Sequence, residues 1–319
     1  HKYSMDLVVG RDVYLPQIQK LKNHINLIKI NSIVREINPV LDLKALVAIC
    51  ELMRKRKYDL INTHHAKIGV LGRIAGKLVG VPVIVHTLQG STFHDAYHPA
   101  MRRFNVLLER ILSEITTHYV SVGYDLRDSY IKQGIAEMAD YTIIRPAMDL
   151  GRFLRTGQLD HDAIQRKRQE LGIAEGDIII GKVARFVPGK GYEFAIKAAR
   201  FVVEKHPGVR FVFVGGGPTQ SVIEKMAADY GLEDKVIFAQ FREDIAEVMA
   251  TFDIAILTSL YEGMSQTLAQ LVAVGKPIVT FEVDGAREVV RDGVNGFIVP
   301  LKDIDQLVEK IDYLLLDLD

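Results

Sequence analysis

Short apolar runs alternate with longer amphipathic segments along nearly the whole chain, and this alternation restricts the fold more than any other feature. Apolar runs bounded by turn residues are typical of buried strands, and the amphipathic segments between them are typical of helices. The predicted strands of the first half are Leu7–Gly10, Leu27–Ile30, Leu60–Thr63, Val83–His86, Tyr119–Val122 and Tyr141–Ile144. Those of the second half are Ile178–Val183, Arg210–Val214, Val236–Phe238, Ile254–Leu257, Ile278–Phe281 and Phe297–Val299. This order predicts an α/β fold with parallel sheets.

The chain of 319 residues has room for two such domains, each doubly wound and Rossmann-like. The predicted helices of the first half are Asp42–Lys57, Lys67–Val79, Met101–Ser113 and Gly123–Gln133. We place a linker at 145–153 and domains at 1–148 and 149–319, facing each other across a cleft. We expect the first domain to lack its first, central strand, because the opening residues read as the approach to a second strand. We also expect the chain to lack a final helix after 303–316.

Composition is that of an ordinary globular protein, with 48 % apolar and 25 % charged residues. No apolar run reaches the roughly 18 to 20 residues that a membrane-spanning helix needs, and no signal peptide is apparent. The single cysteine, Cys50, lies on an apolar helical stripe and fits a packed core in a reducing compartment. We therefore predict a cytoplasmic protein.

Charge is distributed unevenly, because residues 1–150 hold 20 Lys and Arg against 14 Asp and Glu, while residues 151–319 hold 20 against 26. A basic half could face an anionic membrane surface or a phosphate-bearing acceptor, or it could reflect ordinary surface variation. The basic segment 101–110 is a candidate for peripheral membrane contact, although its apolar stripe is also the pattern of a core-facing helix. No dense basic cluster is interleaved with aromatic residues, which argues against nucleic acid.

A polar turn follows the predicted strand Ile254–Leu257 and carries Glu262 and Gly263. A helix is predicted to start near Ser265 and to stop at Gly275, ahead of the next strand. The turn therefore brings a carboxylate and free backbone N–H groups to the carboxyl end of a strand, where open α/β sheets bind ligands and helix N-termini favour anions. This chemistry suits a ligand with a phosphate and hydroxyl groups, which indicates a sugar nucleotide.

A second loop follows the predicted strand Ile178–Val183 and carries Arg185 and Lys190 among glycine and proline residues. Two cations five residues apart across such a loop can converge on a diphosphate, Arg as a fork of donors and Lys as a point charge. On its own, the loop could equally be a surface turn with solvated cations. Together with Glu262, at the end of another strand of the same sheet, it favours a diphosphate site.

The motifs together resemble the retaining GT-B glycosyltransferases of the large family 4 type, the "glycosyl transferases group 1", which includes lipopolysaccharide and exopolysaccharide transferases. The resemblance covers most of the chain. Besides the Arg185/Lys190 loop, it is carried by Val34–Pro39, His64–Arg73, His86–His94, Gly215–Pro218, Tyr261–Gly263 through Gly275–Pro277, and Asp292–Phe297. It implies two Rossmann-like domains, a nucleoside diphosphate sugar as the donor, and no cofactor or metal.

The resemblance also assigns roles to residues. Residues matching Arg185 and Lys190 hold the donor diphosphate, and the residue matching Glu262 contacts hydroxyls of the donor sugar. We count these three as catalytic. The predicted donor-binding residues are Gly263, Met264, Ser265, Gln266 and Thr267 of the turn, Gln270, Gly216, Phe241 and Arg242 near the base, and Gln89 and His94 of the first domain.

Two positions depart from the family pattern. Gln270 stands where a second glutamate normally accepts hydrogen bonds from the ribose, so we expect a neutral and weaker contact, or a residue that merely packs in its helix. Gln89 stands where family members usually carry a histidine, which excludes acid–base chemistry at that position. His94 could compensate, or it could be an ordinary surface or packing histidine.

The predicted activity is that of a retaining, metal-independent hexosyltransferase that uses a UDP- or GDP-linked sugar. The predicted acceptor is a glycan or a lipid-linked hydroxyl compound in cell-envelope or exopolysaccharide synthesis, and the predicted location is the cytoplasm or the inner face of the membrane. The alternatives are a sugar-nucleotide epimerase of GT-B architecture and a non-catalytic or weakly active sugar-nucleotide binder in truncated or engineered form.

Overall fold

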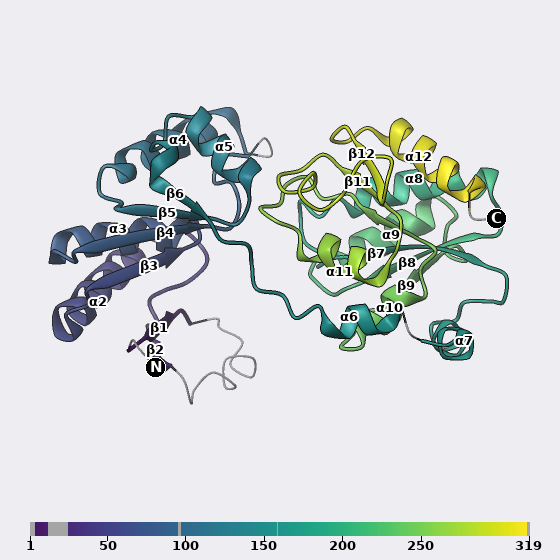
Figure 1. The fold of residues 1–319 in the computed structure, drawn as a ribbon, viewed down its shortest axis with the longest axis horizontal. Coiled ribbons are helices and arrows are strands. Elements are labelled where there is room, and N and C mark those ends of the chain that lie inside the picture. The colour runs from purple at the N-terminus through teal and green to yellow at the C-terminus, as the bar shows by residue number, and fades with distance from the viewer. Residues whose placement is uncertain (1–3, 12–24, 95–96, 158, 318–319) are drawn as a thin grey trace. The chain divides into compact units, whose positions relative to one another are not determined.

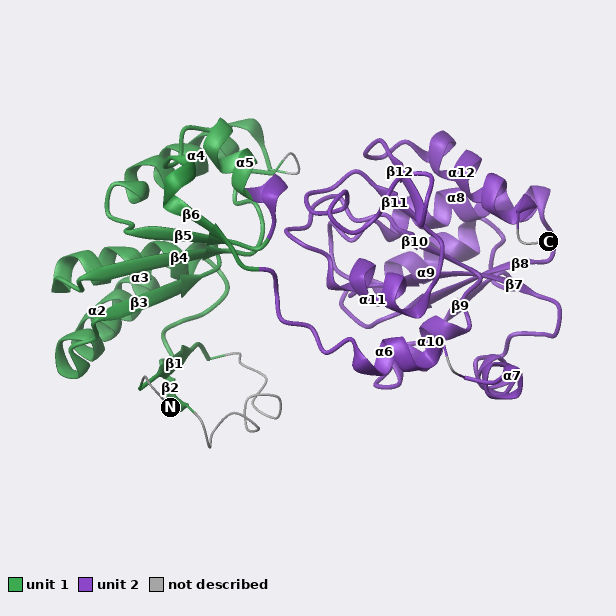
Figure 2. Ribbon diagram, in the orientation of Figure 1, with its two compact units in different colours: residues 1–122, 127–144 green, residues 123–126, 145–319 purple. Residues whose placement is uncertain are grey.

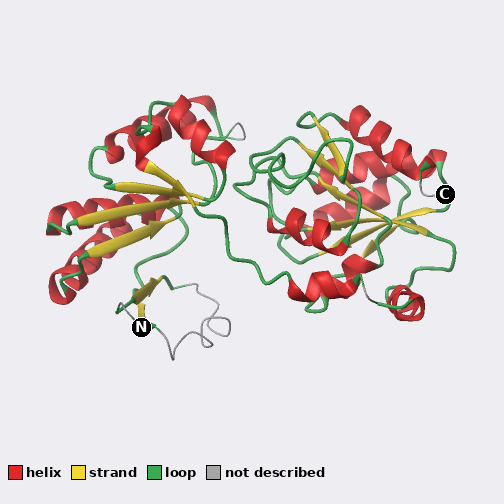
Figure 3. Cartoon of the chain, in the orientation of Figure 1, coloured by secondary structure: helices red, strands yellow, loops and turns green. Residues whose placement is uncertain are grey.

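The computed structural model describes residues 4–11, 25–94, 97–157 and 159–317. The chain divides into two compact units (Figures 1 and 2). Unit 1 consists of residues 1–122 and 127–144, and unit 2 of residues 123–126 and 145–319. Both units combine parallel strands with helices (Figure 3), so the predicted α/β class is confirmed.

Unit 1 contains a parallel sheet in the order β3-β4-β5-β6, and β1 and β2 pair with each other in a separate parallel sheet rather than extending it. Its strands are β1 (Asp6–Val9), β2 (Asn26–Lys29), β3 (Leu60–His64), β4 (Val83–Leu88), β5 (His118–Ser121) and β6 (Tyr141–Ile143). Its helices are α2 (Pro39–Arg56), α3 (Ala66–Val79), α4 (Pro99–Ser113), α5 (Tyr124–Lys132, which unit 2 shares) and the 3-10 turn η1 (Met138–Asp140).

Helix α2 begins three residues before the predicted start at Asp42, and its cap explains why. The side chain of Asn38 accepts hydrogen bonds from the backbone N–H groups of Val40 and Leu41, and Pro39 occupies the first helical position. Cys50 lies on the buried face of this helix, as predicted, in the apolar core that α2 and α3 share.

Unit 2 is a doubly wound sheet of six parallel strands in the order β12-β11-β10-β7-β8-β9. Its strands are β7 (Ile178–Val183), β8 (Val209–Val214), β9 (Val236–Phe238), β10 (Ile254–Leu257), β11 (Ile278–Phe281) and β12 (Gly296–Val299). Its helices are α6 (Gly151–Thr156), α7 (His161–Glu170), α8 (Tyr192–Lys205), α9 (Gln220–Asp229), α10 (Ile245–Ala250), α11 (Gln266–Val274) and α12 (Ile304–Leu316). One apolar cluster joins the sheet to α8, α9 and α12, and a second joins it to α6, α10 and α11.

The linker predicted at 145–153 overlaps the first turn of α6. Phe153 is 1 % exposed and belongs to the apolar cluster that α10 and α11 also form. Residues from Gly151 onward are therefore part of the core of unit 2, because a buried aromatic side chain fixes them there.

Candidate functional site

Backbone hydrogen bonds connect four loops at the carboxyl ends of neighbouring strands in unit 2. The N–H of Leu260 donates to the carbonyl of Gly189 at 2.8 Å, and the N–H of Phe186 donates to the carbonyl of Gly216 at 3.0 Å. The N–H of Gly215 donates to the carbonyl of Gln240 at 2.8 Å. The loops after β7, β8, β9 and β10 therefore form one connected surface, at the edge where open α/β sheets bind ligands.

A glycine allows the loop after β7 to approach the end of β10. Gly191 has a φ of 64°, and a Cβ atom at this position would lie 1.8 Å from the carbonyl oxygen of Thr258. A side chain here would push the two backbones apart. The glycine thus holds Lys190, its neighbour in the loop, beside the turn that follows β10.

Lys190 and Glu262 form an ion pair across this junction. Lys190 Nζ donates to Glu262 Oε1 at 2.6 Å, although the two residues are 72 positions apart, and both side chains are largely shielded from solvent. Arg185 lies on the same loop after β7 and is exposed to solvent. Among the described residues, its guanidinium has no hydrogen-bond or ion-pair partner, so its five donors are available to an anion. The three residues predicted to be catalytic therefore lie on two adjacent loops of one sheet edge.

The turn after Glu262 leads directly into helix α11. The Ser265 side chain caps this helix by accepting a hydrogen bond from the N–H of Leu268 at 3.4 Å. The first N–H groups of a helix have no partner within the helix, and its dipole favours negative charge at that end. Gln266 and Thr267 supply such groups here. This arrangement suits the anion-binding role predicted for the turn, including Gly263 and Met264, and that role stays a prediction.

Two polar side chains near this turn have no hydrogen-bond partner among the described residues. Gln270 is half-buried on α11, eight residues after Glu262. The hydroxyl of Ser259, just beyond the end of β10, is fully buried. Gln270 can accept one hydrogen bond and donate another, as a diol would require. Ser259 was not predicted from the sequence.

The loop after β9 presents an aromatic ring to solvent. Phe241 is 73 % exposed and lies close to Gly216. Arg242, in contrast, is held by carboxylates, because its guanidinium bonds to Asp244 at 2.6 Å and also to Glu170. These carboxylates raise the pKa of Arg242 above its ordinary value. Phe241 is thus free to stack on a ring, whereas Arg242 would have to leave its carboxylates to contact a ligand.

Sequence reasoning missed Lys182, which lies beneath the loop that carries Lys190. Its side chain is fully buried, and its Nζ donates to the Thr258 hydroxyl at 2.8 Å. That hydroxyl donates in turn to the carbonyl of Gly191 at 2.6 Å. Burial lowers the pKa of Lys182 to about 7. The signal that could have revealed it is a lone lysine in the apolar run of β7.

In unit 1, Gln89 and His64 also lie at the carboxyl ends of neighbouring parallel strands, β4 and β3. Gln89 Nε2 lies 3.3 Å from His64 Nδ1, and burial lowers the pKa of His64, with His65 adding to this effect. His94 stacks on Tyr97 with their ring centroids 4.3 Å apart. The contribution of Gln89 and His94 to donor binding stays a prediction.

Family models match both units. The model described as "Glycosyl transferases group 1" matches residues 163–318, and the model described as "Glycosyl transferase 4-like" matches residues 6–120. Together they include the loops after β7 to β10 and the strands β1 to β4.

Relatives and solved structures agree with these matches. The chain is 26 % identical over 302 residues to the UDP-Gal:alpha-D-GlcNAc-diphosphoundecaprenol alpha-1,3-galactosyltransferase of Escherichia coli, covering 93 % of this chain and 76 % of that protein. It is 25 % identical over 287 residues to the capsular polysaccharide biosynthesis glycosyltransferase CapM of Staphylococcus aureus, covering 89 % and 74 %. The structure of Anabaena HepE in complex with UDP-glucose superimposes with a TM-score of 0.79 at 23 % identity, covering 97 % of this chain and 82 % of HepE.

Proposed function

The chain belongs to the group 1 glycosyltransferases of GT-B fold, and from this premise we propose that it is a retaining glycosyltransferase. It would move a hexose from a nucleoside diphosphate sugar to a hydroxyl group of an acceptor. The observation that carries the proposal is the pairing of Lys190 with Glu262 beside Arg185, at the ends of β7 and β10. Two cations and one carboxylate at one sheet edge match a diphosphate and the hydroxyls of a sugar.

Arg185 and Lys190 would act on the leaving group. As the bond between the sugar C1 and the diphosphate oxygen breaks, its electron pair moves to the diphosphate, where the guanidinium and ammonium stabilise the added charge. Lys190 is already oriented by Glu262, so little reorganisation is needed when the phosphate arrives. Glu262 would accept hydrogen bonds from the sugar hydroxyls and so fix the position of C1.

The acceptor would attack from the face that the diphosphate leaves. Its hydroxyl oxygen forms the new bond to C1, and its proton passes to the departing phosphate oxygen, so no enzyme base is required. This front-side displacement retains the configuration at C1. Since Arg185 and Lys190 supply the charge stabilisation, we propose that transfer needs no metal, and chelation by EDTA should leave the rate unchanged.

The names of the relatives support a proposal for the donor and acceptor classes. The Escherichia coli relative takes UDP-Gal and a diphosphoundecaprenol-linked sugar, and the CapM relative acts in capsular polysaccharide biosynthesis. We propose a UDP-linked sugar first and a GDP-linked sugar second, with a lipid-linked glycan as the acceptor, in envelope or exopolysaccharide synthesis. We propose that the protein acts in the cytoplasm, at the inner face of the membrane.

The test compares three variants in a screen of UDP- and GDP-sugars. Arg185→Ala and Lys190→Ala should each lower turnover by about 100-fold or more while the protein stays folded, because each removes charge stabilisation of the leaving group. Lys205→Ala is the matched control, since Lys205 lies on the exposed surface of α8 and pairs there with Asp312 of α12.

Near-normal turnover in both site variants would overturn the assignment. Binding of the donor with neither transfer nor hydrolysis would instead favour the non-catalytic binder, and conversion of the donor to a sugar epimer would favour the epimerase.

A further inference from the structure

Helix α4 exposes its apolar stripe, so of the two interpretations of segment 101–110 the core-facing helix is wrong. Met101, Phe104, Leu107 and Ile111 are between 46 % and 60 % exposed. They follow one another at helical spacing along a helix of 15 residues. A contiguous ridge of large apolar side chains on a surface helix marks an interaction site.

A buried ion pair fixes the orientation of α4, so that this ridge faces solvent. Glu109 is the only acid within α4, and it lies on the opposite face, where it bonds to Arg73 of α3 at 2.9 Å. Both side chains are almost completely buried. Because rotating α4 would break this pair in a low-dielectric environment, the orientation of the ridge is fixed by the fold.

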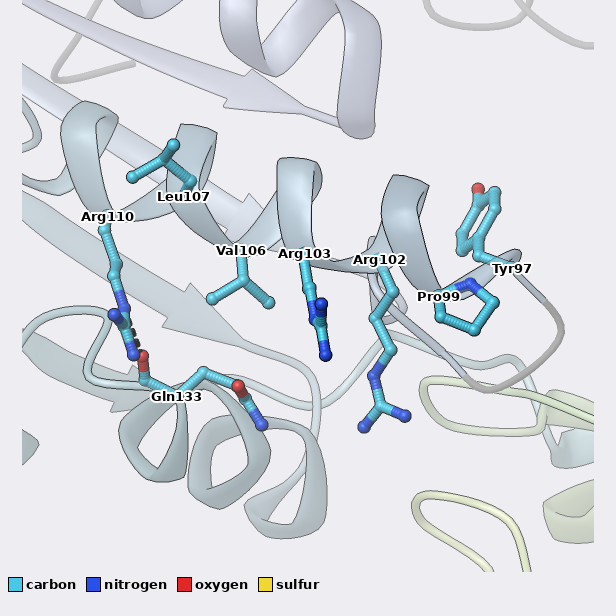
Figure 4. A pocket seen from close by; sticks show the side chains of 8 residues that line it. All are labelled: Tyr97, Pro99, Arg102, Arg103, Val106, Leu107, Arg110 and Gln133. Atoms are coloured by element: carbon cyan, nitrogen blue, oxygen red, sulfur yellow. Dashed lines mark hydrogen bonds between the residues drawn. The ribbon is translucent and has the colours of Figure 1, made fainter.

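The charges of α4 that reach solvent are all positive. Arg102, Arg103 and Arg110 extend from one side of the helix, with Val106 between them (Figure 4). They line a hollow of about 650 Å³ together with Gln133, whose carbonyl accepts a hydrogen bond from Arg110 Nε at 2.6 Å. The nearest acid along the chain is Glu114, immediately after the last residue of the helix.

We propose that the apolar ridge of α4 and the arginines beside it dock on an anionic lipid bilayer. The ridge of Met101, Phe104, Leu107 and Ile111 would enter the boundary between headgroups and acyl chains, and the neighbouring arginines would bind lipid phosphates. A second copy of the chain fits this surface less well, because a two-fold contact places a patch on itself and would bring like charges together. No helix among the described residues is long and apolar enough to cross a membrane, which is a separate matter from docking on its surface. Docking would also bring the protein to the acceptor of the proposed function, since a lipid-linked acceptor lies in the plane of the membrane.

The test measures co-sedimentation with vesicles of phosphatidylcholine alone and of phosphatidylcholine with phosphatidylglycerol. The wild-type protein should bind the anionic vesicles only, and binding should weaken as salt is added. The double variant Phe104→Ser/Ile111→Ser should bind at least tenfold more weakly, because it removes apolar area from the ridge. Arg103→Gln should weaken binding about fivefold, in keeping with the worth of one basic residue near a charged membrane.

Matched controls separate the ridge from general effects. Phe201→Ser removes an exposed aromatic residue from α8 of unit 2, and Arg54→Gln/Lys55→Gln removes exposed charge from the last turn of α2. Neither should change binding by more than about twofold. Equal binding of the wild-type and ridge variants, or no binding to anionic vesicles, would overturn the proposal. So would a wild-type dimer in sedimentation that the ridge variant abolishes, since the face would then be a contact between copies.

The outcome is independent of the proposed activity. Ridge variants should retain hydrolysis of the nucleotide sugar or transfer to a short soluble acceptor, because α4 contributes no residue to the donor site of unit 2. Arg185→Ala should lose turnover yet bind vesicles normally. A wild-type protein that binds vesicles but turns over no sugar would contradict the proposed function alone.

Discussion

The two units bury charge in opposite ways. Unit 1 buries a complementary pair, Arg73 with Glu109, in the packing between α3 and α4. Unit 2 buries a single cation, Lys182, with a hydroxyl as its hydrogen-bond partner and an aromatic ring, that of Tyr192, 4.8 Å from its Nζ. A paired charge can remain ionised in a core, whereas an isolated one lowers its own pKa toward neutrality. The pair therefore fixes a helix, and the single lysine lies under the loop that carries Lys190, with a charge that depends on pH.

Breaking the pair should have the largest effect on stability. Glu109→Leu leaves Arg73 buried without a counter-charge, so the free energy of unfolding of unit 1 should fall by about 3–5 kcal/mol. Urea denaturation followed by circular dichroism measures the fall, because the chain has no tryptophan to report it by fluorescence. Hydrogen exchange then shows which unit has lost protection.

The double variant Arg73→Met/Glu109→Leu is the control for this experiment. Replacing both partners by apolar side chains removes the uncompensated charge, so most of the lost stability should return. If Glu109→Leu alone costs less than about 1 kcal/mol, the pair is not what orients α4.

The single lysine should show its effect through pH. The native-state pKa of Lys182 is lowered to about 7, below that of an unfolded lysine, so the unfolded chain binds more protons between these two values. Stability of unit 2 should therefore rise with pH, by about 2 kcal/mol from pH 7 to pH 9, and the penalty should be fully present below pH 7. Denaturation at a series of pH values measures this slope.

Lys182→Met should remove that slope. Methionine fills a similar volume without a charge, so the variant should be at least as stable as the wild type at pH 6. Lys197→Met on α8 is the matched control, because it removes a lysine that is not fully buried and should leave the slope in place. A slope that survives in Lys182→Met would show that this lysine keeps an ordinary pKa.

Strand positions were predictable from the sequence because they depend on local composition. The apolar run Ile254–Leu257 is β10 to the residue, and Ile178–Val183 is β7. The sheet edge that carries the candidate site followed from the same runs, since parallel strands end together. Both loops of the candidate site are therefore predictable from the sequence alone.

The buried face of α4, the buried Lys182 and the pairing of Lys190 with Glu262 were not predicted. All three depend on partners far away in the sequence. The period of α4 shows that it has an apolar stripe, but only Arg73, 36 residues before Glu109, decides which face is buried. Similarly, Lys182 bonds to Thr258 across 76 residues, and Lys190 pairs with Glu262 across 72. Periodicity reports which residues share a face of an element, whereas the choice of the buried face is made by tertiary contacts.

The smallest predicted effect concerns ligand affinity rather than stability. Gln270 is half-buried on α11 without a hydrogen-bond partner among the described residues, where the resemblance implies a glutamate that accepts from ribose hydroxyls. Gln270→Glu would turn neutral hydrogen bonds into charge-assisted ones, so the donor should bind about fivefold more tightly. Calorimetric titration with a UDP-sugar measures the change, and Gln169→Glu on the exposed surface of α7 controls for the added negative charge.

If the introduced carboxylate instead weakens binding, it faces the diphosphate and not the ribose, and the donor lies differently along α11. Unchanged affinity would mean that this side chain only packs in its helix, so that donor recognition in unit 2 depends on the cations and Glu262.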